Sequence, residues 1–275
     1  MDFGVAIFPT AYTMPPADLG VALEERGFES VWVAEHTHIP ASRRSPYPGG
    51  GDLPQMYYDT FDPFLALTAM ASVTKKLKLG TGICLVVERD PLVTAKEVAT
   101  LDVISGGRFL FGVGGGWNIE EMENHGTDPS TRFKRMRESV EAMRVIWTED
   151  PAEYHGDVID FDPLHLSPKP ISPPPVHIGG GSPHGARRAA GYGNGWIPIG
   201  GRDGDPLDHV ATLREECEKV GRDPSEVELS SYFGPTDPAE IERLAEGGYD
   251  RIVFGLPSVP AEKLLPILDN LATKI

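Results

Sequence analysis

The segment 35–38, Glu-His-Thr-His, offers the side chains best suited to chemistry, and it directly follows a short apolar run at 30–34. Imidazole gains and loses a proton near neutral pH. His36 could therefore act as a general acid or base, or donate a hydrogen bond to a bound cofactor. A capped loop histidine without a chemical role is the alternative interpretation.

The spacing of His36 and His38 also resembles a pair of metal ligands, which would need further ligands from other strand ends. His177 lies within a later apolar run, but the run at 196–199 offers no histidine and the run at 251–254 no carboxylate. We therefore predict no metal site.

Glycines interrupt two apolar runs that the pattern predicts as strands. In the first, Gly82-Ile83 follows Gly80, which indicates either close approach of the backbone to a flat ligand or a tight bend. In the second, residues 112–118 read Gly-Val-Gly-Gly-Gly-Trp-Asn. Bare amides beside an aromatic ring suit a planar cofactor, whereas the acidic partner of a dinucleotide fingerprint is absent from this context. The candidate residues of this run are Gly114, Gly115, Gly116, Trp117 and Asn118.

A third glycine run opens a helix and predicts an anion site. Gly179, Gly180, Gly181 and Ser182 precede a helical segment that carries Arg187. Free amides at a helix start, a hydroxyl and a guanidinium together bind phosphate. The alternative is an ordinary helix cap with surface arginines.

Eight short apolar runs alternate with amphipathic segments, and this alternation must position these groups. Alternating strands and helices predict a parallel sheet, and eight units in 275 residues favour a closed (β/α)₈ TIM barrel over an open sheet. We predict a single domain over 1–275. The expected strands are 5–8, 30–34, 77–85, 109–113, 175–178, 196–199, 227–232 and 251–254, and the expected helices are 15–27, 64–74, 91–105, 132–147, 182–191, 206–220, 238–246 and 261–273.

Two connections are longer than a barrel requires. The segment 38–62 follows a strand, so it belongs to the catalytic face and is a candidate lid or substrate loop. The segment 148–174 precedes a strand and contains the sequence of a small hairpin at 154–158, for which we expect a structural role.

Composition narrows the class of protein. The net charge of −16 disfavours binding to nucleic acid or to anionic membranes, and it requires a local basic patch for any anionic cofactor. Two distant cysteines indicate a reducing compartment, and the N-terminal residues resemble neither a signal peptide nor a membrane span. We expect a cytoplasmic protein.

Beyond these local patterns, the motifs in their order along the chain resemble the luciferase-like monooxygenase superfamily, and within it the group that uses the deazaflavin coenzyme F420. The run Leu-Asp-x-Ile-Ser-Gly-Gly-Arg at 101–108 is the most specific. The other matching segments are 31–36, 79–83, 96–108, 112–118, the helix with Arg135, Glu138 and Trp147, 167–170, 178–182 and 193–196.

The resemblance implies a flavin-like ring across the barrel mouth. Glu35 and His36 match the acidic-histidine pair that faces the ring, and we expect both to be catalytic. Gly82-Ile83 matches a non-prolyl cis peptide behind the ring. The residues 114–117 match the strand edge near the ring, and 179–182 match the loop that receives the phosphate tail.

Two positions depart from the family pattern, and the first bears on the substrate. Relatives that oxidise a sugar phosphate carry a glutamate at about the position of Trp117, so its absence counts against that substrate. Asn194 replaces the usual aspartate of an Asp-Gly-Trp motif, for which we expect a structural effect only.

We therefore predict an F420-dependent oxidoreductase that transfers hydride between the deazaflavin and a small organic substrate. Two alternatives stay open: an FMN-dependent monooxygenase that receives reduced flavin from a separate reductase, and a non-catalytic barrel that only binds a cofactor. By analogy with other barrels we expect a homodimer.

Overall fold

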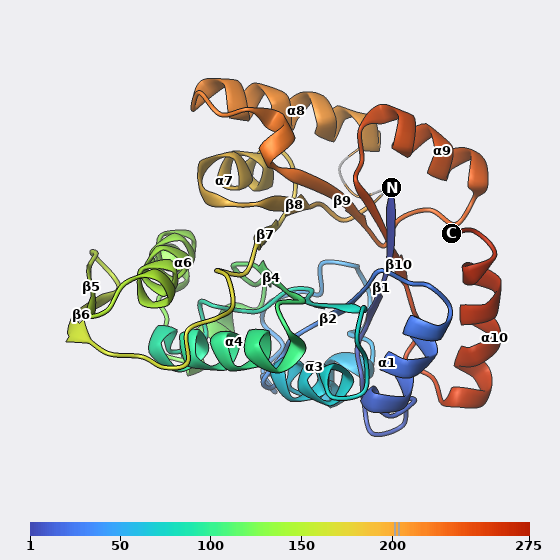
Figure 1. Cartoon of the computed structure of the whole chain (residues 1–275), viewed down its shortest axis with the longest axis horizontal. Coiled ribbons are helices and arrows are strands. Elements are labelled where there is room, and N and C mark those ends of the chain that lie inside the picture. The colour runs from blue at the N-terminus through green and yellow to red at the C-terminus, as the bar shows by residue number, and fades with distance from the viewer. Residues whose placement is uncertain (201, 203) are drawn as a thin grey trace.

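The computed structural model, which describes residues 1–200, 202 and 204–275, contains a closed barrel of eight parallel strands. Neighbours around the barrel follow the order β1-β10-β9-β8-β7-β4-β3-β2, and the helices surround it (Figure 1). The predicted TIM barrel is thus confirmed. The barrel strands are β1 (Asp2–Ile7), β2 (Ser30–Val33), β3 (Lys78–Thr81), β4 (Phe109–Val113), β7 (Val176–Gly179), β8 (Gly195–Ile197), β9 (Glu228–Tyr232) and β10 (Arg251–Gly255).

All eight predicted helices are present. They are α1 (Pro16–Glu25), α3 (Pro63–Ala71), α4 (Pro91–Ser105), α6 (Arg132–Thr148), α7 (His184–Tyr192), α8 (Pro206–Lys219), α9 (Pro238–Gly247) and α10 (Ala261–Ala272). An Asp-Pro pair begins α3, α4, α8 and α9, and in each case the aspartate carboxylate accepts a backbone N–H of the first turn. Such caps satisfy amides that the helix itself leaves unpaired, while proline loses nothing at this position.

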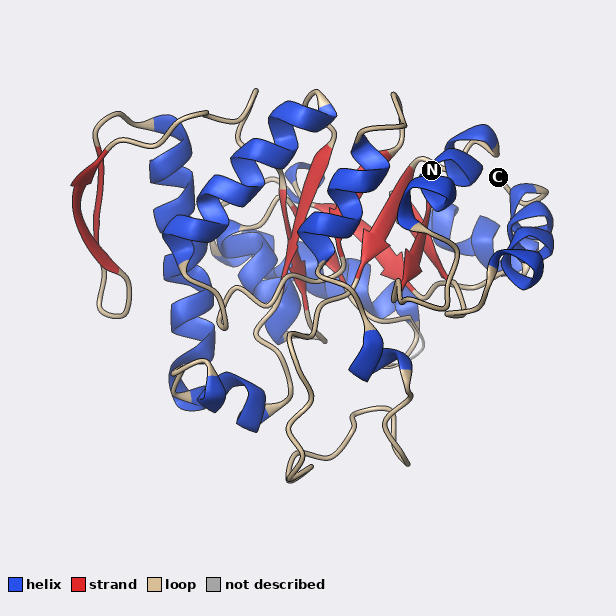
Figure 2. Cartoon of the chain, turned by 90° about the horizontal axis from the view of Figure 1, so that it is seen from below, coloured by secondary structure: helices blue, strands red, loops and turns tan. Residues whose placement is uncertain are grey.

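Four short elements are absent from the sequence prediction: α2 (Met56–Asp59), α5 (Ile119–Asn124) and the 3₁₀ turns at Pro129–Thr131 and Pro224–Glu226. The predicted hairpin is present as β5 (Ala152–His155) and β6 (Asp160–Leu164), which stand apart from the barrel strands (Figure 2). The third predicted strand is shorter than expected. Beyond Thr81 the ladder gives way to separate bonds, among them Cys84 N–H to the Gly112 carbonyl at 2.7 Å.

The main hydrophobic core lies between the strands and the helices, and a smaller cluster that includes Trp32 and Tyr232 is a separate set of buried residues. A buried ion pair fills the amino-terminal end of the barrel. Arg251 is 1% exposed and pairs with Glu29 at 2.9 Å. His177 packs edge-on against Trp32 at this level, and burial lowers its pKa to about 3. His177 is therefore a neutral ring packed inside the barrel.

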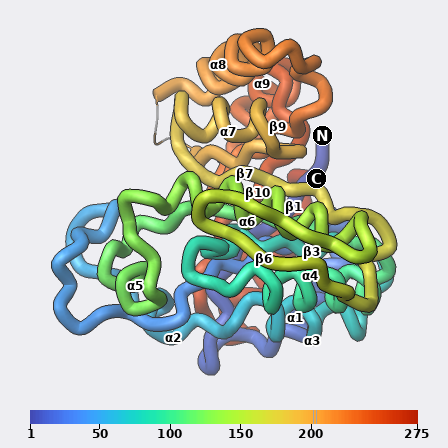
Figure 3. The backbone as a smooth tube through the Cα atoms, turned by 90° about the vertical axis from the view of Figure 1, so that its left-hand side faces the viewer, coloured from blue at the N-terminus to red at the C-terminus, as the bar shows by residue number. Residues whose placement is uncertain are grey.

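No helix among the described residues is long and apolar enough to cross a membrane. The segment 38–62 and α5 lie side by side although they are far apart in sequence, as the blue and green tubes of Figure 3 show. The Ser45 N–H donates to Glu120 of α5 at 2.9 Å, which fixes this contact.

Candidate active site

A cavity of about 550 Å³ opens where the carboxyl ends of the barrel strands meet. This is the face at which barrel enzymes carry their active sites. The structure brings most of the predicted site residues together there, because they lie at the carboxyl ends of four barrel strands, β2, β3, β4 and β7. The predicted residues that line the cavity are Glu35, His36, Gly82, Ile83, Gly114, Gly115, Gly116, Trp117, Gly179, Gly180, Gly181 and Ser182.

Backbone without side chains forms part of the cavity wall. A Cβ atom at Gly82 would lie 2.2 Å from the Tyr232 hydroxyl, and one at Gly114 would lie 2.5 Å from Ile83. The Tyr232 hydroxyl donates to the Gly82 carbonyl at 2.6 Å, and the Gly82-Ile83 peptide is cis, as the resemblance implied. The wall therefore accommodates glycine only, and it presents flat peptide surface to a ligand.

His36 is held by a buried carboxylate. Its Nδ1 lies 2.7 Å from Oε2 of Glu121, and the two side chains are 6% and 0% exposed. A carboxylate accepts hydrogen bonds, so Nδ1 carries the proton in the neutral ring and Nε2 is the nitrogen left for a ligand. The Trp117 ring meets His36 edge-on at 5.8 Å. The His36–Glu121 pair therefore leaves the Nε2 of His36 as a proton acceptor beside the Trp117 ring.

Glu121 is the functional residue that sequence reasoning missed. It belongs to the six-residue helix α5, which has no clear apolar periodicity, and its second oxygen accepts the Thr37 N–H at 3.0 Å. The sequence offered one signal for this residue, the acidic pair Glu120-Glu121 shortly after the glycine run. Asn118, which we predicted to bind cofactor, is buried outside the cavity lining, and its amide nitrogen lies 3.4 Å from Glu121.

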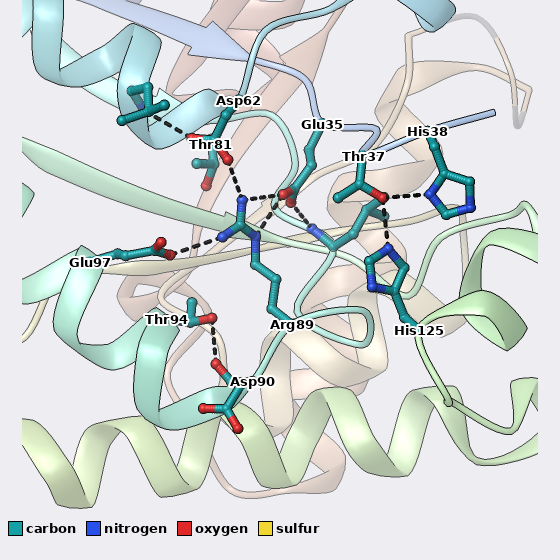
Figure 4. Close-up of polar contacts among 12 residues, drawn as sticks. Glu35, Thr37, His38, Asp62, Thr81, Arg89, Asp90, Thr94, Glu97 and His125 are labelled. Atoms are coloured by element: carbon teal, nitrogen blue, oxygen red, sulfur yellow. Dashed lines mark hydrogen bonds and ion pairs between the residues drawn. The ribbon is translucent and has the colours of Figure 1, made fainter.

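The segment that follows β2 is also fastened to the end of α5. The Thr37 hydroxyl lies 2.9 Å from His38 Nδ1 and 2.7 Å from His125 Nε2 (Figure 4). His38 therefore contributes to a structural contact of its own and is not paired with His36. Among the described residues no group of three or more His, Cys, Asp or Glu side chains could hold a metal ion.

Both carboxylate oxygens of Glu35 accept hydrogen bonds from the protein. The Leu85 N–H donates to one oxygen at 2.6 Å, and Arg89 Nε donates to the other at 2.6 Å. The same guanidinium contacts Asp62 at 2.8 Å and Glu97 at 2.9 Å (Figure 4). Burial acts to lower the pKa of Arg89, but Glu35, Glu97 and the other acidic groups around the guanidinium together outweigh burial and raise that pKa. Glu35 and Arg89 together tie the segments that follow the neighbouring strands β2 and β3.

A basic and aromatic end of the cavity lies beside Ser182. Arg132 and Arg188 line it, and their guanidinium carbons lie 4.5 and 3.6 Å from the Phe133 ring centre. Burial lowers the pKa of Arg188, and Arg132 adds like-charge repulsion. An anion bound here would relieve that repulsion. Arg187, which we predicted for the anion site, pairs with Glu216 at 3.2 Å outside the lining, whereas its neighbour Arg188 lines the cavity.

Glu88 lies behind the cavity wall and has no hydrogen-bond partner for either oxygen among the described residues. Its Oε1 is 3.6 Å from the position of a Cβ atom at Gly116. Burial raises its pKa to about 9, and the carboxylates of Glu121 and Glu35 add to the effect. Glu88 is therefore a neutral acid at pH 7.

We expect Glu88→Gln to stabilise the protein increasingly as the pH rises. Between about pH 4.5 and 9 the folded state holds a proton on Glu88 that the unfolded chain has lost, so stability of the natural protein falls over this range. The glutamine variant lacks this loss, and we expect it to gain about 1–3 kcal/mol at pH 8. Urea unfolding at pH 5 and pH 8 measures the difference. Equal pH dependence in both proteins would contradict the buried neutral acid.

Comparison with known proteins decides the family. The family model of luciferase-like monooxygenases matches residues 9–252. The chain belongs to this family. An uncharacterised protein from Mycobacterium tuberculosis is 36% identical to this chain, and the match covers 100% of this chain and 99% of that protein. The F420-dependent glucose-6-phosphate dehydrogenase of Amycolatopsis mediterranei is 32% identical over 68% of this chain and 54% of its own length.

Solved structures agree with the luciferase-like fold. The monooxygenase RslO1 from Streptomyces bottropensis matches with a TM-score of 0.79 and 22% identity, covering 100% of this chain and 98% of its own. The F420-dependent tetrahydromethanopterin reductase from Methanopyrus kandleri matches with a TM-score of 0.77 and 20% identity over the same shares. Members of this family are oxidoreductases and monooxygenases, which supports enzymatic activity for this protein.

Proposed function

We propose that this luciferase-like protein is an F420-dependent oxidoreductase that transfers hydride between the deazaflavin and a small organic substrate. The observation that carries the proposal is the position of the His36–Glu121 pair beside a glycine-walled cavity with two arginines at one end. The dehydrogenase relative named above supports F420 as the cofactor.

The residues present fit such a cofactor. The peptide planes at Gly82-Ile83 and Gly114–Gly116 offer a flat apolar support for a tricyclic ring, and Trp117 borders it. Arg132, Arg188 and the Ser182 region would hold the phosphate tail. When bound, the deazaflavin supplies two-electron chemistry, giving or taking a hydride.

His36 would handle the proton that accompanies the hydride. With Nδ1–H donated to Glu121, the Nε2 lone pair accepts the proton of a substrate hydroxyl during oxidation. The charge that develops on the ring is stabilised by the Glu121 carboxylate. In the reverse direction the protonated ring donates to a carbonyl oxygen, and the aromatic surroundings exclude water.

We expect Arg188→Met to weaken F420 binding by about tenfold to a hundredfold, because one charge-assisted bond to phosphate is lost. Arg187→Met is a matched control one residue away, since Arg187 pairs with Glu216 instead. Calorimetric titration of both variants with F420 gives the two values of Kd. Equal weakening in both variants, or in neither, would remove Arg188 from the phosphate site.

The FMN-dependent monooxygenase stays the competing function, and a solved FMN complex of a Baeyer–Villiger monooxygenase matches with a TM-score of 0.64 and 22% identity. An anaerobic assay separates the two. Reduction of F420 by an alcohol, or oxidation of reduced F420 by a carbonyl compound, in the absence of oxygen supports our proposal. Turnover that requires both reduced FMN and oxygen would replace it, and binding without any turnover would favour the non-catalytic barrel.

A further inference from the structure

A second hollow, of about 460 Å³, adjoins the cavity on the side of the segment 38–62. Tyr57, Trp117, Arg202 and Phe233 line both spaces, so the hollow and the cavity are direct neighbours. The Arg202 guanidinium donates to the Pro48 carbonyl at 3.0 Å, which joins the hollow's two sides. This hollow lies beyond the glycine wall assigned to the cofactor and is the natural place for the body of a substrate.

Aromatic rings form the walls of this hollow. The Tyr47 ring meets Tyr57 edge-on at 5.3 Å and meets Trp117 edge-on at 6.1 Å. Phe233 adds a third kind of aromatic side chain to the wall, and its ring is 42% exposed. Edge-to-face walls of this kind accept a flat apolar ligand, because its faces and edges find complementary ring quadrupoles.

The polar groups of the hollow are mainly hydrogen-bond donors. The Tyr47 and Tyr57 hydroxyls lie 3.3 Å apart, and burial raises the pKa of Tyr57, which keeps it a neutral donor. Arg202, which lines the hollow, brings a positive charge. No Asp or Glu side chain among the described residues lines the hollow. In a chain of net charge −16 this sign of charge is local and opposes the average.

We propose that the substrate is a planar, largely apolar carboxylate whose body lies between these rings and whose carboxylate pairs with Arg202. A guanidinium recognises a planar carboxylate through paired N–H donors. This proposal rests on the proposed function only where it places the reacting end of the substrate toward His36. The binding of the body and of the carboxylate depends on the hollow alone.

The test compares two ligands of the same shape and different charge, 2-naphthoate and 2-naphthamide. Calorimetric titration uses the whole chain, both without cofactor and saturated with F420. We expect naphthoate to bind about tenfold to a hundredfold more tightly than naphthamide, which is the effect of one charge-assisted bond. Arg202→Met removes this preference, and Arg187→Met, which alters an arginine paired with Glu216 elsewhere, preserves it.

Each outcome decides the proposal. Equal affinity for the acid and the amide overturns it. A preference that survives Arg202→Met and disappears in Arg188→Met also overturns it, because the anion would then occupy the phosphate end of the cavity. If the preference depends on Arg202 but the protein binds no F420, the substrate class stands and the proposed function fails. A variant that does not fold is replaced by Arg202→Lys, which retains the charge, and we expect a weakened preference.

Discussion

His36→Ala lowers kcat by about 10²–10⁴-fold while the Kd for F420 changes little, because the imidazole transfers a proton in the reaction and is not the main anchor of the cofactor. The ring is 6% exposed and its Nδ1 is committed to Glu121, so Nε2 is available to a substrate. The measurement is single-turnover reduction of F420 by the substrate that the anaerobic assay identifies, with a separate titration of F420.

Glu121→Gln is the companion variant for this prediction. It keeps the size of the side chain, but it removes the negative charge beside His36 and leaves one oxygen to accept either the Thr37 N–H or the His36 Nδ1–H. We expect a smaller loss of kcat, about 10–100-fold, because the imidazole is still present but its protonated form is less stabilised and its orientation is less fixed. Unchanged turnover in His36→Ala would refute the assigned role.

Arg89→Met is expected to lower the free energy of unfolding by about 3–5 kcal/mol, the range for breaking a buried ion pair from one side. Arg89 is 13% exposed, and its partner Glu35 is 2% exposed and has no other cation within the contacts described. Loss of the guanidinium leaves that carboxylate buried and unpaired. Urea unfolding of the purified variant at neutral pH measures the change.

The control for Arg89 is Glu97→Gln. Glu97 contacts the same guanidinium at 2.9 Å but is 36% exposed, so we expect a change below about 1 kcal/mol. The contrast between the two variants assigns the energy to the buried contact with Glu35. Similar losses in both variants would instead show that the whole network acts as a unit.

The barrel was predictable because its signals are local and repeat along the chain. Proline at the first helical position and glycine after the last one bracket α4 at Pro91–Ser105, the predicted range, and Gly106 takes the left-handed conformation that ends it. The glycine runs were predictable for the same reason. Each follows a strand, and parallel strands bring their carboxyl ends to one face.

The residues that were missed depend on packing that no local pattern encodes. Glu121 reaches His36 from a helix of six residues, too short for periodicity to identify. Arg187 and Arg188 differ by one position, which turns the side chain by about 100° around a helix. α7 begins at His184, not at the predicted residue 182, so the phase of the helix could not be fixed beforehand. Glu88 sits in a loop, and only the fold reveals its burial.

The central claim is that the cavity binds F420, and titration of the protein with F420 and with FMN while tryptophan fluorescence is recorded tests it most directly. Trp117 lines the cavity, whereas the other three tryptophans are buried in the core, so a bound ring quenches Trp117 and the Trp117→Phe variant loses that signal. We predict tight quenching by F420 and little by FMN. Tight quenching by FMN alone would contradict the account and would make the protein a flavin-dependent monooxygenase.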